Sequence, residues 1–403
     1  MRHTRKHEFS AENQPKSPGR YERMVIYMKK RVILFLLLII LTFFLPGCYD
    51  FVRLDALSIV SGFGVDWDKE KQEYKVSTLI SKTSSDKDSS VVSVYAEETG
   101  KSIIDTTHKI FGEISGQIYS NHCDVVVIGE ALAERGIKSL IDTLFRIPDM
   151  EKEVDVVIAK ESEASDILKA KSKNSPITTA EIKSILKSEN EFLGENIVMS
   201  LLRLDGILSD GCLSAVIPAF SFSDEEKENI KIAGCAVFSG DRLAGYLNEE
   251  DNRLVALMQN GKTRAAIFNK PEPDSQFMTA GIRKYKSEIT PKMNDGLPGI
   301  SVYLKGDITV LETEGMTVTK ELFSNEQALQ KEFENALNDK MTFLIGRLQN
   351  QFGCDIFGFS NAFRNVYRKE WRDMESDWTQ IFRSLKVTVS SDLKMINTNL
   401  SME

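Results

Sequence analysis

The chain has 403 residues, of which 42% are hydrophobic and 27% are charged, and its formal net charge at pH 7 is −8. Nine of the 51 basic and three of the 59 acidic residues precede Cys48. The rest of the chain therefore has 42 basic and 56 acidic residues, which gives a net charge near −14. This balance argues against a nucleic-acid-binding protein and against adhesion of the protein surface to anionic lipid. The length beyond Cys48 predicts two or three domains.

The first predicted element is a bacterial lipoprotein export signal at residues 28–48. A cationic cluster at 29–31 precedes an apolar run of 14 residues at 32–45. This run suits a signal core and is shorter than the roughly 20 residues that a membrane-spanning helix needs. The run ends in Leu-Pro-Gly-Cys, which resembles a lipobox in which the Cys48 sulfur receives the lipid before cleavage. The alternative is a membrane anchor that is never cleaved.

The residues before Met28 are polar, lack periodicity and are excluded from the predicted fold. They are either a long amino extension or the result of a wrongly assigned start, because Met1, Met24 and Met28 are alternative starting points.

Residues 48–170 are predicted to form an N-terminal mixed α/β domain. Alternating or continuous apolar runs predict strands at 57–67, 74–80, 91–96, 124–129 and 154–159, the first two joined as a hairpin by the turn at 68–71. Helical spacing predicts helices at 103–111, 131–133, 137–145 and 162–170.

A polar stretch at 171–176, closed by a proline, predicts a boundary and a small middle domain at 171–225. This domain is expected to contain two helices and a strand, at 180–189, 196–208 and 213–219.

Residues 226–403 are predicted to form a C-terminal α/β domain. Its strands are expected at 230–238, 243–247, 281–290 and 300–311, and its first helix is expected at 249–258.

A long amphipathic helix is predicted at 324–352, with Ser324 and Gln327 forming a capping box at its start. Its apolar positions step by three or four: Leu329, Phe333, Leu337, Met341, Leu344, Leu348 and Phe352. The stripe is expected to pack against its own domain, with partner binding as the alternative.

A second helical pattern places Trp371, Met374, Trp378 and Phe382 along one face. Core packing is expected. Trp371 and Trp378 are also candidate partner contacts, because exposed tryptophans would form a hot spot for another subunit.

The sequence predicts no catalytic, cofactor-binding or metal-binding residues. Cys123, Cys212, Cys235 and Cys354 are far apart, have no metal-ligand spacing and are expected to be small buried apolar residues, with no disulfide assigned. Only two histidines, His108 and His122, follow Cys48, too few for a convincing acid–base or metal site.

Two further motifs are expected to be structural. The Gly62-Phe63-Gly64 motif lacks the third glycine of a dinucleotide loop and predicts a tight turn or close packing. Asp66 and Asp68 are expected in a turn, without the further oxygen ligands of a calcium loop.

Several motifs in order resemble the Ger(x)C family, the C-subunit lipoproteins of spore nutrient germinant receptors. They are Gly47-Cys48-Tyr49-Asp50, where the family usually has Trp in place of Tyr49, and the segments 57–66, 127–137, 144–149, 234–247, 354–359 and the region of Trp371. The resemblance implies an α+β, mixed α/β protein of three domains, with mixed sheets flanked by helices. Cys48 is the one functional residue that it transfers.

The resemblance also implies a non-enzymatic role in nutrient-triggered spore germination. The protein would be held by its lipid on the outer face of the spore inner membrane, together with an A subunit and a polytopic B subunit. The nutrient, the cognate subunits and direct nutrient binding by this chain are left open. The alternatives are a solute-binding lipoprotein that acts alone at the outer surface of the cytoplasmic membrane, and an exported lipid-anchored hydrolase, which the shortage of histidine disfavours.

Overall fold

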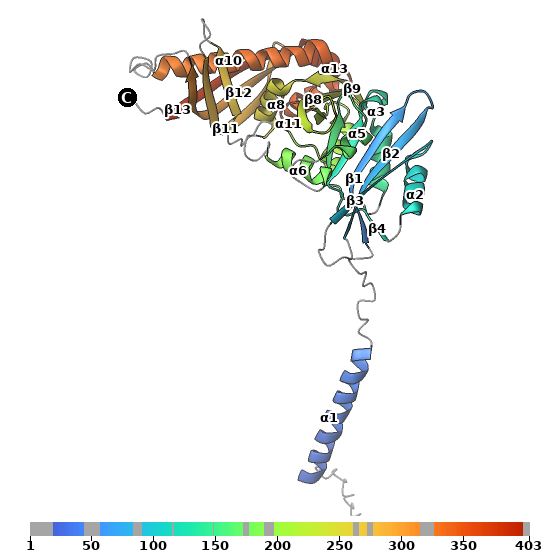
Figure 1. The fold of residues 1–403 in the computed structure, drawn as a ribbon. Helices are drawn as coiled ribbons and strands as arrows, with labels where there is room; N and C mark the ends of the chain where they lie inside the picture. Colours follow the sequence, from blue (N-terminus) through green and yellow to red (C-terminus); the bar gives the residue numbers. More distant parts are fainter. Residues whose placement is uncertain are drawn as a thin grey trace, which may run out of the picture. The chain divides into compact units, whose positions relative to one another are not determined.

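The computed structural model describes residues 19–43, 57–83, 91–114, 117–147, 149–171, 177–188, 197–260, 266–271, 277–314 and 326–397. The chain divides into two units, residues 1–53 and residues 54–403 (Figure 1). Each unit is described by itself.

The first unit contributes one described helix, α1 (Arg20–Phe43), of 24 residues. The predicted apolar run is helical as far as Phe43, and its side chains from Val32 to Ile39 are exposed. In the part of the chain that the structure describes, no helix combines the length and the apolar character needed to cross a membrane. Cys48 lies outside the described residues.

The second unit is built on a nine-stranded mixed sheet with the order β3-β2-β1-β5-β6-β7-β8-β9, in which β4 also pairs with β1. The four central strands are parallel, and antiparallel strands flank them on both sides. The strands are β1 (Leu57–Asp68), β2 (Glu73–Thr83), β3 (Val91–Gly100), β4 (Gln117–Tyr119), β5 (Val125–Gly129), β6 (Asp155–Ala159), β7 (Val216–Phe222), β8 (Ile230–Ser239) and β9 (Arg242–Leu247). The predicted hairpin is confirmed as β1–β2, with Asp68 opposite Glu73.

Helices cover both faces of this sheet, which explains the continuous apolar run of β5. Val126 and Ile128 join the core on one face, and Val125 and Val127 join the core on the other. The first core includes residues of α2 (Ile103–Glu113), α3 (Glu130–Arg135), α4 (Lys138–Arg146) and α7 (Leu201–Asp210). The second includes residues of α5 (Ala164–Lys169) and α6 (Thr178–Ser188).

A second sheet has four strands in the order β10-β11-β12-β13. They are β10 (Ala266–Pro271), β11 (Phe277–Asn294), β12 (Leu297–Glu314) and β13 (Lys386–Asn397). The predicted strands at 281–290 and 300–311 are the middle parts of β11 and β12, whose antiparallel pairing continues to Asn294 and Leu297. β10, β13 and β4 were not predicted from the sequence.

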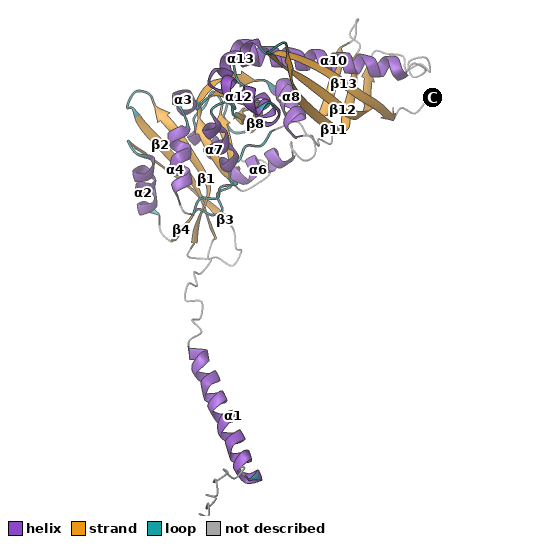
Figure 2. Cartoon of the chain, turned by 180° about the vertical axis from the view of Figure 1, so that it is seen from behind, coloured by secondary structure: helices purple, strands orange, loops and turns teal. Residues whose placement is uncertain are grey.

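The long helix α10 (Glu326–Arg347) lies along the second sheet (Figures 1 and 2). Every residue of its predicted apolar stripe belongs to the core that this sheet shares with α8 (Glu249–Asn260). Packing within the chain is therefore confirmed for the stripe. The last residues of the predicted helix, Leu348–Phe352, form a π-helical turn, and the expected cap Ser324 lies outside the described residues.

The chain between α10 and β13 forms short helices: α11 (Phe359–Val366), α12 (Arg368–Met374) and α13 (Trp378–Ser384). A 3-10 turn at Glu375–Asp377 separates α12 from α13, so the predicted tryptophan helix is two helices. Trp371, Met374, Trp378 and Phe382 nevertheless all join the same core.

The fold class is confirmed as α+β, with mixed sheets flanked by helices. The expected divisions near residues 171 and 226 stay predictions. The large sheet runs across both positions, because β7 and β8 extend the sheet begun by β1.

Candidate functional site

Both candidate contact tryptophans are buried in the C-terminal core. Trp371 is 4% exposed and Trp378 is 2% exposed, and their ring centroids lie 5.1 Å apart. This burial favours the core interpretation over direct contact with another subunit.

Asp355 is a buried carboxylate that joins the start of α11 to α13. It accepts hydrogen bonds from the backbone N–H groups of Phe359 (2.9 Å) and Ser360 (2.7 Å) and from Trp378 Nε1 (3.1 Å). Burial raises the pKa of Asp355 above its ordinary value, although these donors oppose the shift. Three donors on one acceptor indicate a structural role.

Asp66 plays a similar part in the N-terminal half of the unit. It lies within β1, so the predicted turn was wrong at this residue, and it accepts hydrogen bonds from the backbone N–H groups of Ala164 (2.7 Å) and Ser165 (3.1 Å) at the start of α5. Burial raises the pKa of Asp66 to about 6. A Cβ at Gly129 would lie 1.8 Å from Asp66 Oδ1, so glycine makes room for the carboxylate.

The Gly62-Phe63-Gly64 motif serves close packing, as expected. A Cβ at Gly62 would lie 2.4 Å from Thr179 Cγ2, and one at Gly64 would lie 2.4 Å from Ser77 Oγ. The two glycines therefore let neighbouring side chains approach the first strand.

The remaining cysteines and histidines do not form a reactive cluster. Cys123, Cys235 and Cys354 are buried, Cys212 is partly exposed, and all four are free thiols. Desolvation raises the pKa of Cys123 to about 12, which makes its thiol a poor nucleophile. Across the described residues, no group of three His, Cys, Asp or Glu has the arrangement of a metal site.

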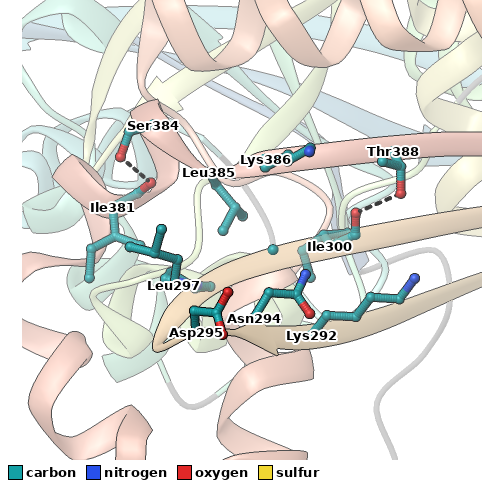
Figure 3. Close-up of a pocket in the computed structure, with 12 residues that line it drawn as sticks. Lys292, Asn294, Asp295, Leu297, Ile300, Ile381, Ser384, Leu385, Lys386 and Thr388 are labelled. Atoms are coloured by element: carbon teal, nitrogen blue, oxygen red, sulfur yellow. Dashed lines mark hydrogen bonds between the residues drawn. The ribbon is translucent and has the colours of Figure 1, made fainter.

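One pocket lies where the β11–β12 hairpin meets the α13–β13 connection (Figure 3). It has a volume of about 460 Å³, and Leu385 points into it in the close-up. Its hydroxyl groups have local partners: Thr388 donates to the carbonyl of Ile300 (3.3 Å) and Ser384 to that of Ile381 (3.2 Å). Because both hydroxyl groups donate to carbonyl groups of the chain itself, neither of them indicates a particular ligand.

A second pocket, here called the Arg203 groove, has a volume of about 330 Å³ and brings α7, the end of α8 and the start of α11 together. It is lined by Met199, Arg203, Ile207, Leu213, Ser214, Val216, Met258, Gln259, Ile356, Phe357, Gly358 and Asn361. Sequence reasoning did not single out Arg203, because an isolated arginine in a predicted helix carries no local signal of a pocket.

Comparison with known proteins supports the expected family. The model described as "Spore germination protein N-terminal domain" matches residues 50–221, and "Spore germination B3/ GerAC like, C-terminal" matches residues 233–399. Spore germination protein KC of Bacillus subtilis is 23% identical over 401 residues, covering 93% of this chain and 97% of the relative. Spore germination protein GerQC of Bacillus cereus is 23% identical over 92% of this chain and 99% of its own length.

A solved structure shares the fold. The crystal structure of the GerBC protein matches with a TM-score of 0.57 and 18% identity, covering 83% of this chain and 97% of the other. The two sheets flanked by helices define an α+β protein, and the two domain models that match in chain order place it in the spore germination class. The chain belongs to the Ger(x)C family.

Proposed function

We propose that this protein is the lipid-anchored C subunit of a nutrient germinant receptor and is required for nutrient-triggered spore germination. The observation that carries the proposal is the match to both germination domain models in chain order over residues 50–221 and 233–399. Relatives named as spore germination proteins align over nearly their whole length, which supports transfer of the role to the whole chain.

The proposed location is the outer face of the spore inner membrane, with Cys48 as the lipidated residue. The signal at 28–48 supports export and attachment through lipid, and the charge near −14 beyond it disfavours attachment through the protein surface. The proposed partners are the A subunit and the polytopic B subunit of the receptor.

The proposed role is non-enzymatic. His108 and His122 are both exposed and lie outside the pockets described above. The buried carboxylates of Asp66 and Asp355 are engaged by backbone N–H groups at helix starts, so their positions are explained by folding.

Dipicolinate release from spores that lack the gene tests this proposal. The spores would be challenged with amino acids, sugars and nucleosides, and with a trigger that acts directly on the membrane. Selective loss of response to one nutrient class, restored by the wild-type gene and not by Cys48→Ala, is expected. Normal release with every nutrient, in a strain that lacks the related receptor genes as well, would contradict the role and favour the lone solute-binding lipoprotein.

A further inference from the structure

The Arg203 guanidinium is held in place by two neutral groups. Arg203 Nη1 donates to the carbonyl of Val198 (3.3 Å), and Arg203 Nη2 donates to Gln259 Oε1 on α8 (3.1 Å). A guanidinium carries five N–H donors, and these two bonds use two of them. The group is therefore oriented between α7 and α8 with donor capacity remaining.

The surroundings of Arg203 differ from those of other fixed arginines in the same unit. Arg347 pairs with Asp251 at 2.5 Å, and Arg364 pairs with Asp210 at 2.6 Å. The described residues that line the Arg203 groove include no Asp or Glu. Arg203 is exposed, so a ligand can reach it. Neighbouring atoms nevertheless desolvate its guanidinium enough to lower the pKa of Arg203. Among the described residues, a cation thus faces the groove with no carboxylate in the groove lining, in a chain that is acidic overall.

The rest of the groove combines apolar walls with a few polar groups. The groove lining includes the apolar side chains of Ile207, Leu213 and Phe357. Asn361 accepts a hydrogen bond from Arg364 Nη1 through its Oδ1 (3.2 Å), so its Nδ2 remains a donor. A volume of about 330 Å³ is in the range of small-molecule sites.

We propose that the Arg203 groove binds a small monocarboxylic acid with a short apolar body, whose carboxylate is bound by Arg203. The planar fork of a guanidinium matches the two oxygens of a carboxylate, and a partly desolvated site strengthens that pairing. The apolar body contacts Ile207, Leu213 and Phe357. An amino acid fits less well, because its ammonium group would enter a groove whose described lining residues include no acidic side chain.

This binding is independent of the proposed role in germination, because it concerns the purified protein alone. The experiment is calorimetric titration of the whole protein in detergent with isovalerate, isoamyl alcohol, isoamylamine, leucine and inorganic phosphate. Arg203→Gln removes the charge, Arg203→Lys keeps the charge and removes the fork, and Arg242→Gln is a matched loss of charge at an exposed residue of β9 outside the groove.

Saturable binding of isovalerate is expected, with at least about tenfold weaker binding by Arg203→Gln and a smaller loss for Arg203→Lys. Arg242→Gln should bind as the wild type does, and the alcohol and the amine should not compete. Unchanged circular dichroism would show that each variant is folded. The proposal is overturned by no saturable binding up to about 10 mM, by equal affinity in Arg203→Gln, or by equal binding of the alcohol or leucine. Phosphate binding as tight as that of isovalerate would indicate a general anion site and would also overturn it.

Discussion

Trp378 Nε1 donates a hydrogen bond to Asp355 Oδ2, 3.1 Å away, whereas the indole nitrogen of Trp371 has no hydrogen-bond partner among the described residues. The two rings are neighbours in the same core, and both are almost fully buried. Two similar side chains therefore differ by one buried hydrogen bond to a carboxylate. This difference makes them a matched pair for measuring that bond.

Trp378→Phe should lower the free energy of unfolding by about 1–3 kcal/mol more than Trp371→Phe does. Both substitutions remove part of an indole from the core, but only Trp378→Phe also takes a donor from the buried Asp355 carboxylate. Urea unfolding of the whole protein, followed by circular dichroism, measures both values. An equal or larger loss in Trp371→Phe would show that the bond to Asp355 contributes no net stability.

Asp66 should make stability depend on pH. Its pKa in the folded protein is about 6, above the ordinary 3.8, so the folded state binds the proton more tightly than the unfolded state does. The contribution of Asp66 to the free energy of unfolding is therefore highest below about pH 4, falls as the pH rises toward about 6, and remains low above it.

Asp66→Asn removes this titration. The free energy of unfolding of the wild type, relative to that of Asp66→Asn, should fall by up to roughly 3 kcal/mol between about pH 4 and pH 7. Asp155, whose pKa burial also raises to about 6, is present in both proteins and cancels in the difference. Asp142→Asn, at an exposed residue of α4, is the control and should give a nearly constant difference. A flat profile for Asp66→Asn would contradict the prediction.

Gly64→Ala should destabilise the protein, because the new Cβ would lie 2.4 Å from Ser77 Oγ and 2.8 Å from Leu168 Cδ1. Relief requires the buried Ser77 and Leu168 side chains to move, and overpacking of this kind typically costs about 1–3 kcal/mol. Gly206→Ala is the matched control: it lies within α7 with nothing within 4 Å of its Cβ position. That substitution should stabilise by about 0.5–1 kcal/mol. Thermal unfolding of both variants checks the opposite signs.

Local periodicity was sufficient to predict the strands and helices whose burial follows a regular pattern. One case is the β1–β2 hairpin, whose strands alternate apolar and polar residues. The other is the stripe of α10, whose apolar positions recur over several helical turns. β13 was missed because its alternation is short, and its partner β12 begins almost ninety positions earlier. β10 contains Asn269, Lys270 and Pro271, which are poor strand formers tolerated at an edge.

Periodicity also could not reveal changes within the helical backbone. Leu348 and Phe352 keep a four-residue spacing while the turn between them widens into a π-helix. Trp371 and Trp378 share a core across a 3-10 turn that their spacing does not reveal.

The candidate groove lies beyond sequence reasoning because its residues come together only through the tertiary fold. Arg203 and Gln259 are 56 positions apart, and Asn361 lies on a third helix. Likewise, Asp66 was expected in a turn because nothing nearby in the sequence shows the helix start that it caps, 98 positions later. Cys48, by contrast, could be predicted as the lipidated residue from the adjacent apolar run, because a signal and its modified residue must be contiguous, and it stays a prediction.

Cys48→Ala should leave the protein as an unlipidated precursor that retains the segment before residue 48. The Cys48 thiol is the proposed acyl acceptor, and cleavage is expected to follow its modification, so alanine blocks both steps. Intact mass of the membrane-extracted protein, together with labelling by a radioactive fatty acid, distinguishes the precursor from the mature form. Cys212→Ala is the matched control, because Cys212 is a partly exposed free thiol outside the signal, and it should be labelled and cleaved as the wild type is. A labelled, mature-sized Cys48→Ala protein would show that another residue carries the lipid, whereas an unlabelled, uncleaved wild type would favour the permanent anchor.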